Sequence, residues 1–454
     1  MDTLDAATLG RHHTIAAVAT PSGRGALAMI RVSGPDVKKL ATMLLDPTPT
    51  IPRHATRCIA RAVDGTVIDD VLATLFIGPH SFTGEDLLEI TTHGGLIVPT
   101  TVLAAVIRGG ASEAEPGEFT RRAVLNKKLD LLQAEAIGDL VDARSSAAHR
   151  LAMRQLDGGL SRRVDSLRQR LLGLEALLAY DIDFPDEDDG PIPRERIVNV
   201  AEELIRALET LLATGEHGTL VHDGALVVLA GAPNVGKSSL FNALLGEARA
   251  IVTEVPGTTR DAIEAVLDLP GWPLRLVDTA GIRDTNDPIE QLGIDTSSRY
   301  LARAALVLAC VDSAELAREV GCLREYTKSP IITVATKCDL PTSNVSPIAD
   351  IAVSAQTGEG LADLLRMIEA RIAGDRGLPA LDAPALTRAR HRAAVSAAVG
   401  EAAMFLTAWR DEMLPASVAA THIRAAANAL SELIGAVYAD DVLDVVFRNF
   451  CVGK

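Results

Sequence analysis

One short segment combines glycines, a lysine and a hydroxyl at a spacing that suits a chain of phosphates. Gly231-Ala-Pro-Asn-Val-Gly236-Lys237-Ser238 fits the pattern GxxxxGK followed by Ser or Thr, and it stands between an apolar run and a helical one. Glycines let the backbone fold with its N–H groups towards an anion, and the next helix adds its positive end. Lys237 would reach the β- and γ-phosphates, and Ser238 would ligate Mg²⁺. The segment therefore predicts a nucleoside triphosphate site.

Two later segments supply the groups that a triphosphate hydrolase needs around the metal. Asp278-Thr-Ala-Gly281 ends a second strand, where the acid would hold Mg²⁺ through water and the Gly281 N–H would sense the γ-phosphate. Thr259, from Gly257-Thr-Thr-Arg-Asp261, is the expected switch threonine that reaches Mg²⁺ only in the triphosphate state.

The residue that would orient the attacking water is missing from its usual place. Ile282 follows Gly281, and an apolar side chain cannot align a nucleophile. Glu290, in the next segment, is our candidate for this task, with a solvated helix carboxylate as the alternative. Arg260 and Arg283 could serve as arginines supplied in cis, or they are surface charges of loops.

Thr336-Lys-Cys-Asp339 stands where a base-reading NKxD motif is expected. Asp339 can accept from the N1–H and the N2 amine of guanine, which adenine does not offer. Because Asp339 is present, we expect the preference for guanine to survive. Thr336 lacks the amide that would bond the base or the neighbouring loop, and its effect on guanine affinity stays open. The predicted GTP contacts are Asn234, Val235, Gly236, Lys237, Ser238, Ser239, Thr253, Glu254, Val255, Pro256, Gly257, Thr258, Thr259, Asp278, Thr279, Ala280, Gly281, Thr336, Lys337, Asp339, Ser354 and Ala355.

The elements around these motifs predict a multidomain chain. Apolar runs at 225–230, 274–277, 306–311, 331–335 and 351–353 alternate with helical segments, which indicates a doubly wound, mostly parallel sheet. Residues 14–20, 28–32 and 71–77 are short strands of a mixed N-terminal part. A helical pattern runs from 129 to 180 and again from 197 to 213, and Ala-rich helices close the chain. We expect a nucleotide domain, 223–376, inserted into a helical domain of 128–222 and 377–454, after an N-terminal domain of 1–127.

Composition excludes several classes of protein. The five cysteines include no CxxC pair, which argues against a zinc site or a disulfide framework and favours a reducing cytoplasm. We find no signal peptide, and no apolar run reaches the roughly 18 residues of a membrane span. The net charge of −16 means that a nucleic-acid partner needs a local basic patch. The candidates are Arg121/Arg122/Lys127/Lys128, Arg162/Arg163/Arg168/Arg170 and Arg388/Arg390/Arg392, with solvated helix faces as the alternative.

Together with their flanks, these motifs resemble the MnmE (TrmE) family of tRNA-modification GTPases. The resemblance covers essentially the whole chain and keeps the order of the family's blocks. These blocks are residues 19–25, 30–34, 81–86, 93–95, 114–122, 125–131 and 183–187, and the terminal Phe-Cys-Val-Gly-Lys at 450–454.

Membership of this family implies a fold and a reaction. The fold is an N-terminal α+β domain that binds tetrahydrofolate and dimerises, a discontinuous helical domain, and an inserted Ras-like P-loop GTPase domain. The reaction, carried out in a heterotetramer with the flavoprotein MnmG, adds an aminomethyl or carboxymethylaminomethyl group to C5 of the wobble uridine of certain tRNAs. The carbon comes from 5-formyl- or 5,10-methylene-tetrahydrofolate, while MnmG carries FAD and uses a reduced nicotinamide.

The resemblance also implies ligands for two more groups. Folate contacts fall on Arg31, Glu89, Lys128 and Lys454, although residues 90–92 depart from the family's more polar pattern near the folate pocket. A potassium ion, which would replace an arginine finger at the phosphates, would be held by Asn234, Thr253, the Val255 carbonyl and Thr258. Pairing of G domains across this face would bring Glu290 towards the attacking water.

Two questions stay open at the level of sequence. The first is the role of Cys451, which is either a nucleophile at C6 of the uridine or a carrier of the one-carbon unit. The alternative is a small packed residue without a chemical role. A potassium-activated GTPase in tRNA modification is the leading function, and the alternatives are a ribosome-assembly GTPase and a regulatory switch that only binds GTP. A ribosome-assembly GTPase would lack the folate-like N-terminus and the terminal Cys-Val-Gly-Lys.

Overall fold

The computed structural model describes the chain with several gaps. The described residues are 13–183, 193–247, 250–251, 263–269, 272–278, 298–311, 316–340, 349–374, 384–411, 415–435, 443, 446–448, 450 and 452–453. The chain divides into two compact units, one made of Met1–Gly138 and Ser431–Lys454, the other of Asp139–Leu430.

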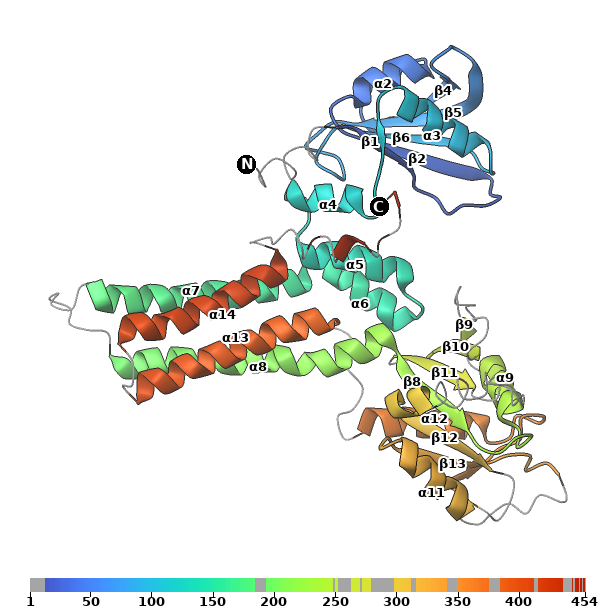
Figure 1. Cartoon of the computed structure of the whole chain (residues 1–454), viewed down its shortest axis with the longest axis vertical. Helices are drawn as coiled ribbons and strands as arrows, with labels where there is room; N and C mark the ends of the chain where they lie inside the picture. Colours follow the sequence, from blue (N-terminus) through green and yellow to red (C-terminus); the bar gives the residue numbers. More distant parts are fainter. Residues whose placement is uncertain are drawn as a thin grey trace, which may run out of the picture. The chain divides into compact units, whose positions relative to one another are not determined.

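A seven-stranded sheet forms the centre of the first unit, in the order β3-β4-β5-β6-β2-β1-β7 (Figure 1). Its neighbours pair antiparallel except β1 and β7, which are parallel. In β2, Ile30 and Val32 are buried and Arg31 between them is only partly so, as expected from the alternation of a strand. The strands are β1 (Ile15–Val18), β2 (Leu27–Ser33), β3 (Leu45–Asp46), β4 (Thr56–Arg61), β5 (Val67–Phe76), β6 (Leu87–His93) and β7 (Ser112–Glu113).

Helices α2 (Val37–Leu44) and α3 (Val98–Arg108) cover one face of this sheet, and their apolar sides share a core with its strands. A second, smaller core forms where α4 (Glu118–Leu125) and α5 (Leu131–Asp142) meet residues from the end of the chain. Leu443 and Phe447 are buried there with Val124 and Leu131. The first unit is therefore assembled from both ends of the sequence.

The second unit contains a seven-stranded sheet in the order β14-β13-β12-β8-β11-β10-β9. Strands β14 to β11 run parallel, and β10 turns back antiparallel against β11 and β9. This confirms a doubly wound, mostly parallel sheet. The strands are β8 (Ala225–Ala230), β9 (Ala250–Ile251), β10 (Ile263–Asp268), β11 (Pro273–Asp278), β12 (Leu306–Val311), β13 (Ile331–Ala335) and β14 (Ile351–Ala352).

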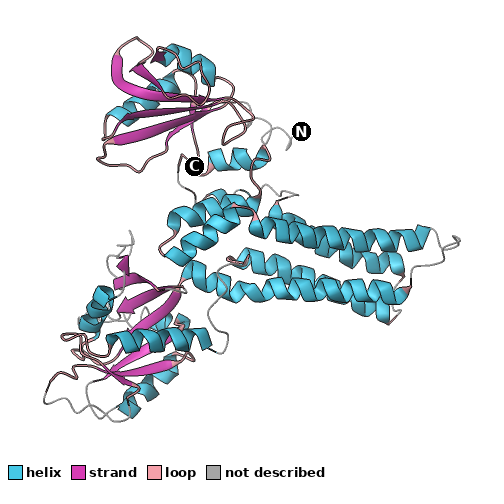
Figure 2. Cartoon of the chain, turned by 180° about the vertical axis from the view of Figure 1, so that it is seen from behind, coloured by secondary structure: helices cyan, strands magenta, loops and turns pink. Residues whose placement is uncertain are grey.

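Helices lie on both faces of this sheet (Figure 2). Helices α9 (Lys237–Glu247) and α12 (Leu361–Ala373) share one core with the strands. Helix α11 (Leu316–Tyr326) and the segment around Leu301 share another. Parallel strands that are covered on both faces read as continuous apolar runs, which is why β8, β12 and β13 were visible in the sequence.

The rest of the unit is helical and flanks the sheet in sequence. Helix α8 precedes the sheet and packs along α13, which follows it. The helical pattern predicted over 129–180 corresponds to three successive helices, α5, α6 and α7, because Ser145 caps a new helix and the chain turns again at Gly158, whose φ is +78°. The helices are α6 (Ser146–Leu156), α7 (Gly159–Asp183), α8 (Arg194–Asp223), α13 (Ala389–Arg410) and α14 (Ala416–Ile434).

The sheet joins the helices through the turn between β10 and β11. Asp268 accepts hydrogen bonds from the Ser146 N–H at 3.1 Å and the Ser146 hydroxyl at 2.6 Å. It therefore supplies an acceptor to the first N–H of α6, which has no partner within the helix. Trp272 is buried in one cluster with Leu151 of α6 and Val221 of α8. The β10–β11 hairpin is thus fixed to the helices at its turn.

Candidate functional site

The loop after β8 is shaped by backbone conformations that side chains rarely allow. Gly231 has φ +145°, and a Cβ there would lie 2.2 Å from the carbonyl oxygen of Cys310, so only glycine fits. Lys237 is the first residue of α9, and its ammonium donates to the carbonyls of Gly231 and Ala232, both at 2.8 Å. A buried cation is therefore held inside a loop whose helix points its N-terminus at the same space.

Ser238 and Asp278 come together at the edge of this loop. The Ser238 hydroxyl donates to Oδ2 of Asp278 at 2.6 Å, and Asp278 is almost fully buried at the end of β11. Strands β8 and β11 are parallel neighbours, so their carboxyl ends bring the two residues to one edge. A hydroxyl beside a buried carboxylate matches the donor set that Mg²⁺ uses next to phosphates.

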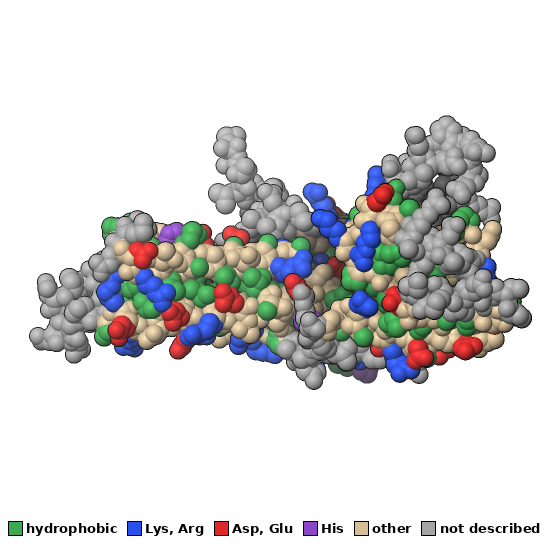
Figure 3. Space-filling model, turned by 90° about the horizontal axis from the view of Figure 1, so that it is seen from below, with side chains coloured by type: hydrophobic (Ala, Val, Ile, Leu, Met, Phe, Trp, Pro, Cys, Tyr) green, Lys and Arg blue, Asp and Glu red, His purple; other side chains and the backbone are tan. Residues whose placement is uncertain are grey.

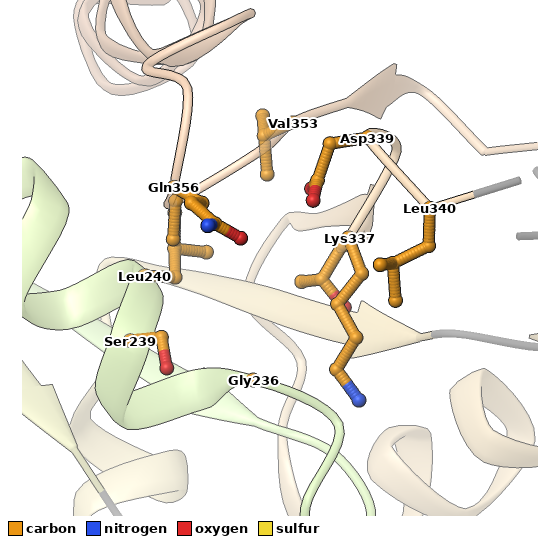
Figure 4. A pocket seen from close by; sticks show the side chains of 10 residues that line it. Gly236, Ser239, Leu240, Lys337, Asp339, Leu340, Val353 and Gln356 are labelled. Carbon is orange, nitrogen blue, oxygen red and sulfur yellow. The ribbon is translucent and has the colours of Figure 1, made fainter.

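A cavity of about 410 Å³ adjoins the phosphate loop. Asp339 and Gln356 point into it from two different loops, and Lys337 runs along its side (Figure 4). Oδ1 of Asp339 accepts from the Ser354 hydroxyl at 2.7 Å, which fixes the carboxylate. The cavity is lined by Gly236, Ser239, Leu240, Thr336, Lys337, Asp339, Leu340, Val353, Ala355 and Gln356. Its apolar walls and one oriented carboxylate suit a flat base with two adjacent donors.

Ser354 organises the second loop of this cavity. It is fully buried, and its oxygen accepts from the backbone N–H groups of Gln356 at 3.3 Å and Thr357 at 3.1 Å. The same hydroxyl holds Asp339, so one residue positions both loops of the base pocket. Beside it, burial followed by the charges of Glu359 and Asp339 raises the pKa of the Cys338 thiol, which keeps this thiol neutral.

Sequence reasoning missed four residues that line the cavity, namely Leu240, Leu340, Val353 and Gln356. Two of them follow directly on motif residues, since Leu340 comes after Asp339 and Gln356 after Ala355. Leu240 lies one helical turn beyond Gly236, so the 3.6-residue period would have placed it beside the loop.

Part of the predicted site lies outside the described residues. This holds for Thr253, Glu254, Val255, Pro256, Gly257, Thr258, Thr259, Thr279, Ala280, Gly281, Glu290, Cys451 and Lys454, and for Arg260, Ile282 and Arg283. Within the described residues, Asn234, Val235, Gly236, Lys237, Ser238, Ser239, Asp278, Thr336, Lys337, Asp339, Ser354 and Ala355 surround the loop and the cavity.

A second group of candidate residues lies in the first unit. Arg31 and Glu89 are cross-strand partners on β2 and β6, and the guanidinium donates to Oε1 of Glu89 at 2.8 and 3.2 Å. It also donates to the carbonyl of Gly453 at 3.3 Å and lies 5.5 Å from the centre of the Phe82 ring. Lys128 instead donates to the Pro79 carbonyl at 2.9 Å. The Gly453 carbonyl of the C-terminal segment thus contacts Arg31.

The proposed basic clusters are only partly surface features. Arg122 is almost fully buried between Glu85 and Glu118, so its assignment to an exposed nucleic-acid contact is wrong. Arg388 is paired with Asp139, and Arg392 donates to Thr219 at 2.9 Å. On the face seen in Figure 3, Lys and Arg side chains alternate with Asp and Glu. Among the described residues, no helix has the length and apolar character that crossing a bilayer requires.

A phosphate loop after a central strand, an aspartate at the end of the adjacent strand and a base pocket beyond them form the arrangement of the P-loop GTPases. Comparison with known proteins narrows this class. A family profile described as the MnmE helical domain matches residues 131–451, and one described as the GTP-binding protein TrmE N-terminus matches residues 14–128. The chain therefore belongs to the MnmE family of tRNA modification GTPases, as the sequence motifs predicted.

Individual relatives match over nearly the whole length. The tRNA modification GTPase MnmE of Moorella thermoacetica is 40% identical, with 97% of this chain and 99% of the relative covered. That of Bordetella parapertussis is 41% identical over the same shares. Among solved structures, Era of Aquifex aeolicus bound to GDP and AlF₄⁻ is 26% identical over 38% of this chain and 65% of its own, with a TM-score of 0.27.

Proposed function

We propose that this chain binds and hydrolyses GTP, with Mg²⁺, and that it uses this cycle in the modification of tRNA. The observation that carries the proposal is the placement of Asp339 in a cavity that opens beside the phosphate loop. Asp339 accepts from guanine, Ala355 lies in the same wall, and Lys237 and the loop N–H groups bind the phosphates. Ser238 and Thr259 ligate Mg²⁺, which when bound neutralises charge on the phosphates.

The base assignment has a direct test. In Asp339→Asn the carboxylate becomes an amide, whose NH₂ donates to the C2 carbonyl of xanthine. The wild-type chain should bind GDP and discriminate against XDP, and Asp339→Asn should reverse that preference. Measured affinities of the two proteins for both nucleotides would show this. Equal GDP preference in both would contradict the base assignment.

For catalysis, we assign the orientation of the attacking water to Glu290 and the monovalent cation site to four ligands. These are Asn234, Thr253, the Val255 carbonyl and Thr258, and K⁺ held there stabilises charge that develops on the phosphates. Asn234 supports the assignment, because it has φ +61° at the exposed tip of the loop. GTP turnover should be strongly activated by KCl compared with NaCl of equal ionic strength, and equal slow rates would refute the cation mechanism.

The first unit is the proposed folate site. Arg31, Glu89, Lys128 and Lys454 hold 5-formyl- or 5,10-methylene-tetrahydrofolate, which supplies the one-carbon unit. Support comes from the contacts of Arg31, which pairs with Glu89 and also contacts the Phe82 ring and the Gly453 carbonyl. A planar ring bound here would find both polar and aromatic partners. Arg31→Ala should weaken binding of 5-formyl-tetrahydrofolate at least about tenfold. Exposed Arg108→Ala is the control, and unchanged binding in Arg31→Ala would contradict the site.

Partners follow from the same family. We propose a homodimer that works with the FAD-carrying MnmG in a heterotetramer, adding an aminomethyl or carboxymethylaminomethyl group at C5 of the wobble uridine. Three large apolar side chains are exposed at one end of β2 and β6, namely Leu27, Leu96 and Ile97. Leu27 pairs with the last residue of β6, and Leu96 and Ile97 follow that strand, so this end of the sheet favours a protein partner. Cys451→Ser with unchanged tRNA modification would remove the role of Cys451 as nucleophile or carrier.

A further inference from the structure

Thr336 is the residue at which the base-reading segment, 336–339, departs from its usual form, and its hydroxyl is directed at the phosphate loop. Oγ1 donates to the carbonyl oxygen of Val235 in the phosphate loop at 2.5 Å. The carbonyl of Val311, at the end of β12, lies 3.4 Å away, and the backbone N–H of Thr336 donates to that same carbonyl at 3.0 Å. Thr336 is 6% exposed, so this contact is shielded from water.

Lys337, the next residue of the base-reading segment, makes a similar contact with the phosphate-loop residue that precedes Val235. The Lys337 ammonium donates to the carbonyl of Asn234 at 2.8 Å, so two consecutive residues of the base segment hold two consecutive carbonyls of the phosphate loop. Asn234 and Lys337 both have φ near +60°, and they are two of the four non-glycine residues with positive φ in the described chain. Such a conformation is strained for residues other than glycine, so contacts are needed to hold it.

We propose that Thr336 is a positioning residue for the nucleotide, because its hydroxyl fixes the phosphate loop in the shape that receives a diphosphate. This rests on the proposed binding of guanine nucleotides. The hydroxyl carries one hydrogen, which is used on Val235, so Thr336 has no donor to offer a base. Base selection therefore falls on Asp339 and its loop, while Thr336 acts on the phosphate side.

A role of Thr336 in fixing the phosphate loop and a role in reading the base predict different effects of mutation on nucleotide affinity. Thr336→Val has nearly the same shape but leaves the buried Val235 carbonyl without its donor. GDP and IDP, which share the diphosphate and differ only at the N2 amine, should both bind about tenfold more weakly. The ratio of the two affinities should stay as in the wild type. Thr336→Ser, which keeps the hydroxyl, should bind both nucleotides within about twofold of the wild type.

The experiment measures the affinities of the full chain for GDP and IDP, with the thermal midpoint of each variant as a check on folding. Wild-type affinity in Thr336→Val, or a changed GDP to IDP ratio, would overturn the proposal. If Thr336→Val does not fold, Thr336→Cys, with a weaker donor, must show the same parallel loss. Absence of selective GDP binding by the wild-type chain would instead defeat the proposed function.

Discussion

The hydroxyl of Ser238 donates a 2.6 Å hydrogen bond to Oδ2 of Asp278, which joins the first turn of α9 to the last residue of β11. The two residues are 40 positions apart in the chain and meet because β8 and β11 are parallel neighbours. Since both carry oxygen atoms suited to Mg²⁺, the hydrogen bond keeps them in place around the position where the ion would bind.

Replacement of Ser238 by Ala should therefore affect turnover more than nucleotide binding. The change removes the proposed Mg²⁺ ligand and the hydroxyl that donates to the buried carboxylate of Asp278, an interaction worth about 1.5–3 kcal/mol. GTP turnover at fixed Mg²⁺ should fall at least about tenfold, while GDP affinity measured without Mg²⁺ changes little. Thr210→Ala, on the exposed side of α8, is a control for the loss of a hydroxyl. Normal turnover in Ser238→Ala would refute the role of Ser238 at the metal.

His222 makes the stability of the second unit depend on pH. Hydrogen bonds to Asp139 at 3.0 Å and Asp223 at 2.7 Å raise its pKa from 6.5 to about 9. Because the folded pKa lies above the unfolded one, the stabilisation is fully present below pH 6.5 and is lost as pH rises through about 9. The melting midpoint of the wild type should exceed that of His222→Gln most at pH 6, and the difference should shrink towards pH 10.

Other charges around His222 belong to the same network. Arg388 is paired with Asp139, and the charges of Arg275 and Arg392 act on Asp223, whose pKa is lowered chiefly by its hydrogen bond with His222. The exposed His149→Gln on α6 controls for the loss of an imidazole. A difference between wild type and His222→Gln that stays constant from pH 6 to 10 would show that the ring does not titrate as described.

Asp268 should stabilise the start of α6 from outside the helix. Asp268→Ala leaves the Ser146 N–H without its acceptor and removes a negative charge near a helix N-terminus, so we expect a loss of about 0.5–2 kcal/mol. Trp272 is buried at this junction, and urea unfolding followed by its fluorescence in a Trp409→Phe background reports on the contact. Asp165→Asn, at a half-buried position of α7 that pairs only weakly with Arg168, should leave the transition in place. An unchanged transition in Asp268→Ala would show that the junction does not depend on this carboxylate.

Arg122 should be needed for folding of the first unit. Its guanidinium donates to Glu118 at 2.7 Å, to Glu85 at 3.1 Å and to the His13 carbonyl at 3.0 Å, and only 5% of the side chain is exposed. Arg122→Met leaves two carboxylates without their cation and should cost about 3–5 kcal/mol. Thermal unfolding of the variant beside exposed Arg108→Met tests this. Stability equal to that of Arg108→Met would contradict a structural role.

The sequence predicted best those elements whose signal is local. Strands β8, β12 and β13 begin and end where their apolar runs do, since both faces of a parallel sheet are covered. Strand β10 was missed, because its Ile-Glu-Ala-Val-Leu-Asp is a short, mixed run that pairs antiparallel near the edge of the sheet. The proposed domain boundaries at 127, 222 and 376 stay predictions.

Contacts between residues far apart in the sequence are the part of the site that the sequence could not predict. The motif showed that Thr336 lacks an amide, but only the fold shows that its hydroxyl reaches Val235, 101 residues away. Arg122 looked like a surface charge because arginines usually are, and its burial depends on Glu85, 37 residues earlier. Phosphate-loop residues were predictable because their chemistry needs consecutive positions, whereas the folate candidates came from family resemblance alone.

The first unit also constrains the order in which the chain can fold during translation. Its smaller core joins Val124 and Leu131 to Leu443 and Phe447, so one half of that core is synthesised long before the other. All of Asp139–Leu430 must leave the ribosome in between. The nascent N-terminal segment therefore exposes an unfinished apolar surface while the nucleotide-binding sheet forms, and it closes only when the last helical residues arrive.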